Sequence, residues 1–257
     1  MHAEIEKLKF VSEFDGPGQE CLFRGSWKFP ASGIVVYLHG ATNHMQQGFN
    51  REIFNGIFAK IQDFLYAENF VYACPEYRGD SWMNPAAEHD TRQLTGLLKK
   101  EFKTERVYIM GGSMGGTSSL IFASRNPDSI NGVLALCPAT DMEKLYYEWI
   151  NGNQNQKQLA YGIEIAYGGN PEQARKEYME RSSIRHMKAL KNIPIAIIHG
   201  DSDKLISVEH SRYFVRNAVK EKISIFYHEI ENGDHDSPVK DFHPVEKAMN
   251  FLFTQVR

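Results

Sequence analysis

Short apolar runs alternate with helical patterns along most of this chain, and no other feature of the sequence restricts the fold as much. One run, from Ile34 to Leu38, is uninterrupted and lies between Gly33 and Gly40. The segment that follows, residues 48–66, carries apolar residues at spacings of three and four, the period of an amphipathic helix. Strands that alternate with helices are typical of βαβ units, whose strands pair in parallel. The sequence therefore predicts an α/β fold with a mostly parallel, twisted sheet and helices on both faces.

The same alternation continues to the end of the chain. It predicts further strands at 70–74, 107–110, 133–137, 195–198 and 223–230, and further helices at 85–101, 115–126, 208–222 and 244–256. The first ~30 residues alternate like antiparallel edge strands. About 55 residues follow residue 137 before the next strand, too many for a plain crossover. We expect this stretch, at about 141–192, to be a helical cap inserted into a single domain that spans residues 1–257.

Composition excludes several classes of protein. The 257 residues are 42% hydrophobic and 24% charged, which is typical of a soluble globular chain. The formal net charge is −3 and no stretch is strongly basic, so we expect no nucleic-acid partner. The longest apolar runs are far too short to span a bilayer, and the N-terminus lacks a signal-peptide pattern, so we expect no membrane partner. The sequence does not indicate an oligomeric state.

Cysteine and histidine spacing indicates neither a disulfide framework nor a metal site. The chain has three cysteines, Cys21, Cys74 and Cys137, an odd number with no C-x-x-C pair. Free cysteines of this kind are commonly small core residues of proteins in the reducing cytoplasm, which we predict as the compartment. The histidines lack the spacing of a zinc-binding helix, and no nucleotide-binding fingerprint occurs. We therefore expect no metal and no cofactor.

The strongest local motif is a G-x-S-x-G pattern, Gly111-Gly112-Ser113-Met114-Gly115, between an expected strand and an expected helix. The pattern alone arises by chance, so its position carries the argument. Glycines at both ends relieve the crowding of a sharp strand-to-helix turn, which lifts Ser113 above the carboxyl ends of the strands. A phosphate-binding glycine loop is the alternative, but neither G-K-[ST] nor G-x-G-x-x-G is present. We therefore expect Ser113 to be a nucleophile.

A serine hydroxyl needs a base that accepts its proton and an acid that orients the base. His235 follows the last expected strand in a turn-rich loop, which places it at the same sheet edge as Ser113. Asp203 follows the strand before that one, from where its carboxylate can reach His235. Asp141, after an earlier strand, is the second candidate for the acid, and Asp201 lies where it would cap a turn.

An oxyanion hole needs preorganised backbone N–H donors. The amide of Met114, the residue after the expected nucleophile, would supply one donor. The loop His39-Gly40-Ala41 after the strand at 34–38 would supply the other, because Gly40 permits a tight turn that presents the Ala41 amide. We expect His39 to be a buried residue that shapes this loop.

With these four loops in order, the chain resembles the α/β-hydrolases from about residue 20 to its C-terminus. The resemblance rests on His39-Gly40-Ala41, Gly111-x-Ser113-x-Gly115, His199-Gly200-x-x-Asp203 and His235, in the family's order of Ser, Asp and His. It implies Ser113 as the nucleophile, His235 as the base and Asp203 as the orienting acid. It also implies that the amides of Ala41 and Met114 form the oxyanion hole.

Within this superfamily, Tyr77-Arg78-Gly79 and the late His-Gly-x-x-Asp are similar to small esterases and to the catalytic domains of prolyl-oligopeptidase-like enzymes. The sequence has no N-terminal region large enough for a propeller, which favours a free-standing esterase over a peptidase. We therefore expect a serine hydrolase that cleaves small carboxylic esters through an acyl-enzyme on Ser113. An aminoacyl or dipeptidyl peptidase is the alternative. A catalytically silent binding protein is less favoured, because every motif is retained.

Several side chains near the expected site are candidates for a substrate pocket: Tyr77, Arg78, Trp82, Tyr146 and Trp149. They would line an acyl or alcohol pocket if the expected cap covers Ser113. Two alternatives stay open. The aromatic residues would instead be core residues that join the cap to the sheet. Arg78 would instead pair with a structural acid such as Asp80 or Asp90.

Overall fold

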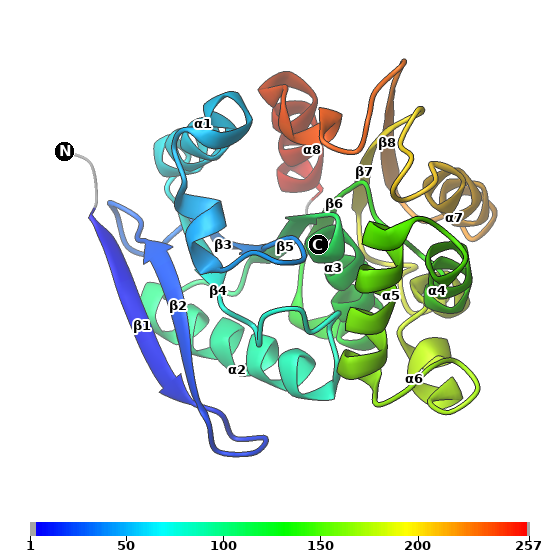
Figure 1. Ribbon diagram of the computed structural model, residues 1–257. Coiled ribbons are helices and arrows are strands. Elements are labelled where there is room, and N and C mark those ends of the chain that lie inside the picture. The colour runs from blue at the N-terminus through cyan, green and yellow to red at the C-terminus, as the bar shows by residue number, and fades with distance from the viewer. Residues whose placement is uncertain (1–3, 256–257) are drawn as a thin grey trace.

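The apolar runs form an eight-stranded sheet in the computed structural model, which describes residues 4–255 (Figure 1). Its strands are β1 (Ile5–Val11), β2 (Gly18–Arg24), β3 (Gly33–Leu38), β4 (Phe70–Pro75), β5 (Val107–Gly112), β6 (Gly132–Leu136), β7 (Ile195–Gly200) and β8 (Ile225–Ile230). They lie in the order β1-β2-β4-β3-β5-β6-β7-β8, and every pairing from β4 to β8 is parallel. The first two strands form an antiparallel hairpin, and β2 pairs antiparallel with β4. The predicted mostly parallel sheet is therefore confirmed.

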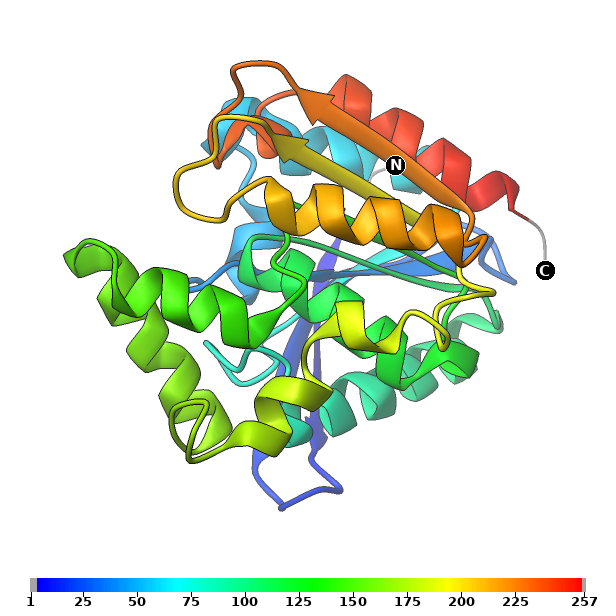
Figure 2. The ribbon, with the colours of Figure 1, turned by 90° about the vertical axis from the view of Figure 1, so that its right-hand side faces the viewer.

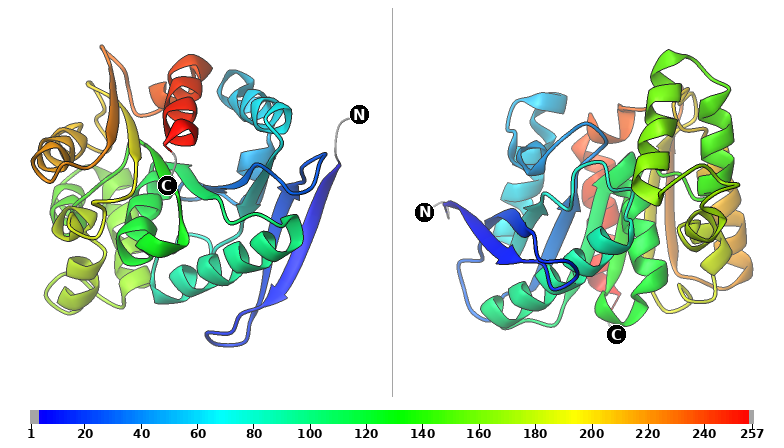
Figure 3. Two further views of the ribbon diagram at one scale, coloured as in Figure 1. Left: turned by 180° about the vertical axis from the view of Figure 1, so that it is seen from behind. Right: turned by 60° about the horizontal axis from the view of Figure 1, so that its bottom comes forward.

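Helices cover both faces of the sheet, as Figure 3 also shows from behind. The α-helices are α1 (Ile53–Ala67), α2 (Pro85–Phe102), α3 (Met114–Arg125), α4 (Met142–Ile150), α5 (Gln154–Tyr167), α6 (Arg175–Glu180), α7 (Glu209–Lys220) and α8 (Phe242–Thr254), with short 3-10 helices η1 (Met45–Phe49), η2 (Pro127–Ser129), η3 (Ser183–His186) and η4 (Ser237–Val239). On one face, α1 and α8 share a core with strand residues such as Tyr37 and Leu136. On the other, α2, α3 and α7 share a core with Ile34 and Ile109. None of the helices in the described part of the chain is long and apolar enough to cross a membrane.

The central strands are buried along their whole length. Every residue of β3, β4, β5, β6 and β7 is buried, because helices cover both faces of this part of the sheet. The edge strand β1 is largely exposed, and β8 is half-buried. Since β3 to β8 run parallel, the loops that follow β3, β5, β7 and β8 all emerge at the same edge of the sheet.

The helix predicted at 48–66 is interrupted in the structure. The 3-10 helix η1 precedes α1, and the backbone of residues 54–56 has positive φ. The Asn50 side chain accepts hydrogen bonds from the amides two and three residues later, at 2.9 and 3.2 Å. Such local hydrogen bonds compete with helix formation. The apolar spacing continues across the interruption, and for this reason the pattern predicted one helix.

The chain between β6 and β7 forms α4, α5, α6 and η3, in the segment where the sequence predicts a cap. In Figure 2, α4 and α5 lie on the side toward which the arrowheads of β7 and β8 point. Glu88 of α2 joins this insertion to the rest of the molecule, because it accepts hydrogen bonds from Arg125 of α3 and from Arg181, which follows α6, both at 2.6 Å. Arg181 is buried. The insertion is therefore fixed against α2 and α3.

Candidate active site

Ser113 lies between β5 and α3, in a turn that its glycine neighbours make possible. Its backbone has φ 57° and ψ −121°, a conformation that costs a non-glycine residue about 1–3 kcal/mol. A Cβ at Gly115 would lie 1.9 Å from the Leu38 carbonyl oxygen, and a Cβ at Gly111 would lie 2.5 Å from the Gly115 carbonyl carbon. Both positions therefore require glycine. The turn presents Ser113 to a cavity at the carboxyl edge of the sheet.

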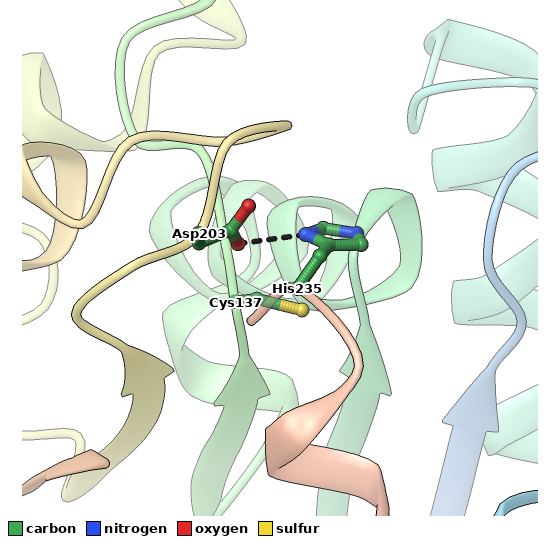
Figure 4. Close-up of side chains that lie close together, drawn as sticks. All are labelled: Cys137, Asp203 and His235. Atoms are coloured by element: carbon green, nitrogen blue, oxygen red, sulfur yellow. Dashed lines mark hydrogen bonds and ion pairs between the residues drawn. The ribbon is translucent and has the colours of Figure 1, made fainter. Parts of the chain in front are cut away.

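Three loops bring Ser113, His235 and Asp203 into one chain of hydrogen bonds. His235 Nε2 lies 3.0 Å from Ser113 Oγ, and His235 Nδ1 lies 2.7 Å from Asp203 Oδ2. Figure 4 shows the contact between Asp203 and His235. With a proton on Nδ1, His235 donates to Asp203 and accepts from the Ser113 hydroxyl. The three residues follow β5, β7 and β8, respectively.

Close packing of the loops after β7 and β8 supports the contact between Asp203 and His235. A Cβ at Gly200 would lie 2.3 Å from the Gly233 carbonyl oxygen, so this approach requires glycine. The Ser202 amide donates to the same carbonyl oxygen at 2.9 Å. Because β7 and β8 are parallel neighbours, both loops begin at one edge of the sheet. The backbone itself therefore holds the carboxylate beside the imidazole.

Asp203 accepts four hydrogen bonds, which hold it in the ionised form. Its Oδ1 accepts from the amides of Leu205, at 2.8 Å, and Ile206, at 3.0 Å. Its Oδ2 accepts from His235 and, at 3.1 Å, from Nε2 of His199. Burial opposes ionisation, but the hydrogen bonds from His199 and His235 outweigh it and hold the pKa of Asp203 well below its usual range.

Two residues that the sequence argument did not assign to the site contact it. His199 is fully buried and reaches Asp203 with Nε2, while its Nδ1 lies 2.7 Å from the Ser211 hydroxyl oxygen. Cys137 follows β6 with a φ of 41°, and its sulfur, an Asp203 oxygen and a His235 nitrogen lie within 4.8 Å of one another (Figure 4). Both residues lie at the carboxyl ends of parallel strands, and this position is the sequence signal that would have found them.

The neighbours of His235 stabilise its protonated form. Burial of the ring opposes protonation, but the Cys137 sulfur and the Asp203 carboxylate outweigh it and raise the pKa of His235 above its ordinary value. A histidine must be deprotonated to accept a serine proton. The His235 ring is therefore neutral, and able to accept a proton, only at pH values above its raised pKa.

The cluster of Cys137, Asp203 and His235 also contains three types of metal ligand: a thiol, a carboxylate and an imidazole. Both oxygens of Asp203 and both ring nitrogens of His235 are already hydrogen-bonded within the protein. A metal ion would have to displace these hydrogen bonds. The geometry therefore favours a hydrogen-bonded chain over a metal centre at this position.

Two backbone amides beside Ser113 are available to a bound oxygen atom. Met114 is the first residue of α3, so its N–H has no acceptor within the helix. The Ala41 amide donates to no backbone or side-chain acceptor among the described residues, and Ala41 lines the cavity. The loop that carries Ala41 is held in place because the Gly40 amide donates to Gln47 Oε1 at 2.9 Å.

The cavity beside Ser113 and His235 has a volume of about 240 Å³. Large apolar side chains form part of its wall: Tyr37, Phe54, Trp149, Leu159, Leu205 and Val239. Trp149 belongs to α4 and Leu159 to α5, so the insertion between β6 and β7 contributes to the wall. The amide side chains of Asn43, Gln47 and Asn155 provide polar groups.

Of the five side chains expected in a substrate pocket, Trp149 lines this cavity and the other four lie elsewhere. Arg78 is engaged in ion pairs, since its Nε donates to Asp90 and its Nη2 to Asp15, both at 2.6 Å. Asp90 is thus the structural partner of Arg78. These pairs leave the guanidinium unavailable to a substrate carboxylate.

Tyr77, Trp82 and Tyr146 are buried in the core instead of lining the cavity. The Tyr77 hydroxyl donates to the His39 carbonyl oxygen at 2.7 Å and so helps to shape the loop after β3. Trp82 packs edge-on against Trp149, with ring centroids 5.6 Å apart. The Tyr146 hydroxyl donates to a carboxylate of α5. The contact of Trp82 with Trp149 joins the insertion to the loop after β4, whereas Tyr146 joins two helices of the insertion to each other. All three residues are core residues, the alternative that the sequence left open.

The other acid candidates have local structural roles. Asp141 is the N-cap of α4, where its Oδ1 accepts from the Lys144 amide at 3.2 Å. The Asp201 side chain accepts from the neighbouring Ser202 hydroxyl at 2.9 Å. Within the described chain, Asp203 is the carboxylate that is hydrogen-bonded to His235.

A parallel sheet of this order, with a serine at the turn after β5, defines the α/β-hydrolase fold. FphF, a fluorophosphonate-binding serine hydrolase of Staphylococcus aureus, matches with a TM-score of 0.74 at 14% identity over 99% of this chain and 100% of that one. Porphyromonas gingivalis dipeptidyl peptidase 4 matches with a TM-score of 0.73 at 14% identity over 100% of this chain but 36% of the longer peptidase.

The sequence narrows this class to one family. Residues 57–257 match the prolyl oligopeptidase family, and the chain belongs to this family of serine hydrolases. An uncharacterised peptidase of Bacillus subtilis, YtmA, is 23% identical over 163 residues, which cover 60% of this chain and 60% of the relative's own length. A monoacylglycerol lipase of Mycolicibacterium smegmatis is 24% identical over 251 residues, 81% of this chain and 85% of the lipase. The predicted resemblance to the α/β-hydrolases is confirmed.

Proposed function

We propose that this protein hydrolyses small carboxylic esters through an acyl-enzyme intermediate on Ser113. The observation that supports this most strongly is the continuous hydrogen-bond chain, with 3.0 Å between Ser113 Oγ and His235 Nε2 and 2.7 Å between His235 Nδ1 and Asp203 Oδ2. Both distances suit proton transfer from a nucleophile to an oriented base. Ser113 is then the nucleophile, His235 the general base and acid, and Asp203 the orienting acid.

In the acylation step, His235 Nε2 accepts the Ser113 proton as Oγ attacks the substrate carbonyl carbon. The imidazolium then protonates the departing alcohol, and the acyl group stays on Ser113. In the deacylation step, water gives a proton to His235 and attacks the acyl carbon, after which His235 returns a proton to Ser113 as the acid leaves. Asp203 stays ionised throughout and stabilises the imidazolium.

The negative charge that develops on the carbonyl oxygen needs donors that are already in place. The amides of Ala41 and Met114 are assigned this role, because both lie beside Ser113 and neither is used by a regular hydrogen bond of a strand or helix. The positive end of the α3 dipole adds to the effect. Removing one such donor typically lowers kcat about 10²–10³-fold.

The size of the cavity favours small esters over peptides. Its volume of about 240 Å³ is below the roughly 300–1,000 Å³ typical of pockets for drug-sized ligands. The likeness to a monoacylglycerol lipase and to a fluorophosphonate-binding hydrolase supports an ester substrate. Aminoacyl or dipeptidyl peptidase activity is the second candidate, which the likeness to YtmA and to dipeptidyl peptidase 4 supports.

Covalent labelling tests the proposal directly. A fluorophosphonate probe is expected to modify Ser113, and Ser113→Ala to abolish labelling and lower kcat on p-nitrophenyl esters about 10⁶-fold. Asp203→Asn is expected to lower kcat about 10⁴-fold by leaving His235 in the wrong tautomer. Ser129→Ala, at η2 beyond the far end of α3, is the matched control and should label normally.

The substrate panel separates the candidate functions. Faster turnover of aminoacyl p-nitroanilides than of p-nitrophenyl esters would favour the peptidase. A folded wild-type protein with neither labelling nor turnover would instead support a catalytically silent binding protein. A cytoplasmic location stays a prediction, supported by three free and buried cysteines.

A further inference from the structure

We propose that the cavity beside Ser113 selects short-chain esters whose acyl and alcohol groups are both uncharged, and that Trp149 and Leu159 set the upper limit of chain length. This inference rests on the proposed hydrolysis at Ser113. It adds the substrate class and the residues that determine it.

Apart from His235, which must be neutral to accept the Ser113 proton, the described part of the cavity wall offers no cation to a substrate anion. Among the described residues that line it, none is a lysine or an arginine. Arg78, the basic residue that the sequence suggested for this role, is held by Asp15 and Asp90 outside the cavity. A carboxylate on the acyl or alcohol group would lose water on entry and find neutral amide donors but no lysine or arginine. The wall therefore disfavours anionic substrates.

The cavity wall also offers little stabilisation to a positively charged substrate, such as one with an ammonium group. Asp236 is the carboxylate among the cavity-lining residues that the structure describes, and its side chain is exposed to water. An ion pair at such a position is screened and contributes little to binding. Aminoacyl substrates therefore gain no strong anchor, whereas the apolar wall favours neutral acyl and alcohol groups.

Trp149 forms a part of the wall that is held from several sides. Its Nε1 donates to the Leu205 carbonyl oxygen at 2.7 Å, and its ring meets the edge of Trp82 at an interplanar angle of 73°. Trp82 is held in turn by Tyr167, whose hydroxyl donates to the Trp82 carbonyl oxygen at 2.9 Å. Closely packed cores resist local expansion. A substrate acyl or alcohol chain that reaches Trp149 therefore contacts a side chain whose packing resists displacement.

Substitutions at Leu159 can change the upper limit of substrate chain length. Leu159 lies on α5, lines the cavity and is half-buried, so a change in its size alters the cavity without removing a buried aromatic ring. Tyr161 lies two residues later on the same helix, is 50% exposed and is outside the cavity lining. Tyr161→Ala is therefore the matched control for substitutions at Leu159.

The test compares kcat/KM along two ester series, p-nitrophenyl esters from acetate to laurate and acetate esters of lengthening alcohols. We expect wild type to prefer the short members and to discriminate against carboxylate-bearing and aminoacyl esters of matched length. Leu159→Ala should shift the preference to longer chains, and Leu159→Phe to shorter ones. The ratio of long to short substrates should change about tenfold or more, since one methylene in an apolar pocket changes specificity about 10–200-fold. Tyr161→Ala should leave the profile unchanged.

A second variant tests the wall itself. Trp149→Phe keeps an aromatic ring but removes the donor to Leu205, and it should also admit longer chains. Fluorophosphonate labelling of each variant reports whether the site is intact. Equal turnover of acetate and laurate by wild type, equal turnover of charged and neutral esters, or unchanged profiles in both Leu159 variants would overturn the inference. Failure of the proposed function is a different result, namely no ester turnover and no labelling of wild type.

Discussion

At the scale of single residues, Cys137 lies beside the proposed catalytic residues without joining the hydrogen bonds between Ser113, His235 and Asp203. It is buried directly after β6, and its sulfur lies beside the His235 ring and the Asp203 carboxylate (Figure 4). A thiolate at this position, like the Asp203 carboxylate, favours the imidazolium over the neutral imidazole. Under the proposed mechanism, we therefore expect Cys137 to influence the pH range in which His235 can accept the Ser113 proton.

Replacing Cys137 by serine is expected to move the acid limb of the pH profile to lower pH. Burial lowers the pKa of His235 while Cys137 and Asp203 raise it, so removal of the sulfur leaves a lower pKa. Because the neutral ring is the base, kcat/KM rises as pH increases through this pKa, and the rise should come earlier in the variant. The measurement is kcat/KM for p-nitrophenyl acetate against pH. The control is Cys74→Ala, which removes a buried sulfur outside the cavity and should leave the acid limb where it is in wild type. An acid limb that stays in place in Cys137→Ser would contradict the proposed effect of Cys137.

The sequence placed Ser113, Asp203 and His235 correctly relative to the strands, because each follows a strand whose apolar pattern is clear. It did not assign His199 to the site, because this residue lies within β7 and reaches Asp203 from four positions earlier. The sequence also could not separate the aromatic residues of the insertion that line the cavity from those that are buried in the core. Trp149 lines the cavity and Tyr146 does not, yet both are large apolar residues on the same helix. Only tertiary packing separates a core position from a wall position.

At the scale of elements, Glu88 joins three helices through two arginines. It lies on α2 and pairs with Arg125 of α3 and with the buried Arg181 after α6. Burial raises the pKa of Glu88, but hydrogen bonds from Arg181 and Arg125 outweigh this and lower it below the ordinary value. The pairing is one of the contacts that fix the insertion, and no periodic pattern in the sequence predicts it.

Glu88→Gln is expected to lower the free energy of unfolding by about 2 kcal/mol, because the buried Arg181 loses its hydrogen-bonded carboxylate and keeps only the ion pair with Glu177 at 3.4 Å. A lowered pKa in the folded state means that the stabilisation is present above the unfolded pKa and is lost as pH falls through the folded one. The difference between variant and wild type should therefore shrink in acid. Urea unfolding at several pH values measures it. Glu105→Gln breaks an exposed pair with Lys99 and should change stability by less than about 1 kcal/mol; equal losses in both variants would contradict the argument.

At the scale of the whole molecule, the alternation of apolar runs and helical periods was enough to predict a parallel sheet covered on both faces. Parallel strands that are buried on both faces carry continuous apolar runs, and β3 to β7 do so. The place of α4, α5 and α6 against the sheet was not predictable in this way. It depends on contacts between distant segments, such as Trp82 with Trp149 and Glu88 with Arg181.

One shared core joins the insertion to the sheet, so we predict a single cooperative unfolding transition. Buried residues of α4, α5 and α6 belong to the same apolar cluster as α2, α3 and the strands. In a Trp27→Phe background, which removes the exposed tryptophan, fluorescence reports on Trp82 and Trp149 at the junction. Far-UV circular dichroism, this fluorescence and ester hydrolysis should then be lost together in urea, as expected for one domain over residues 1–257. Loss of fluorescence and activity at a lower urea concentration than the loss of helical signal would show that the insertion unfolds on its own.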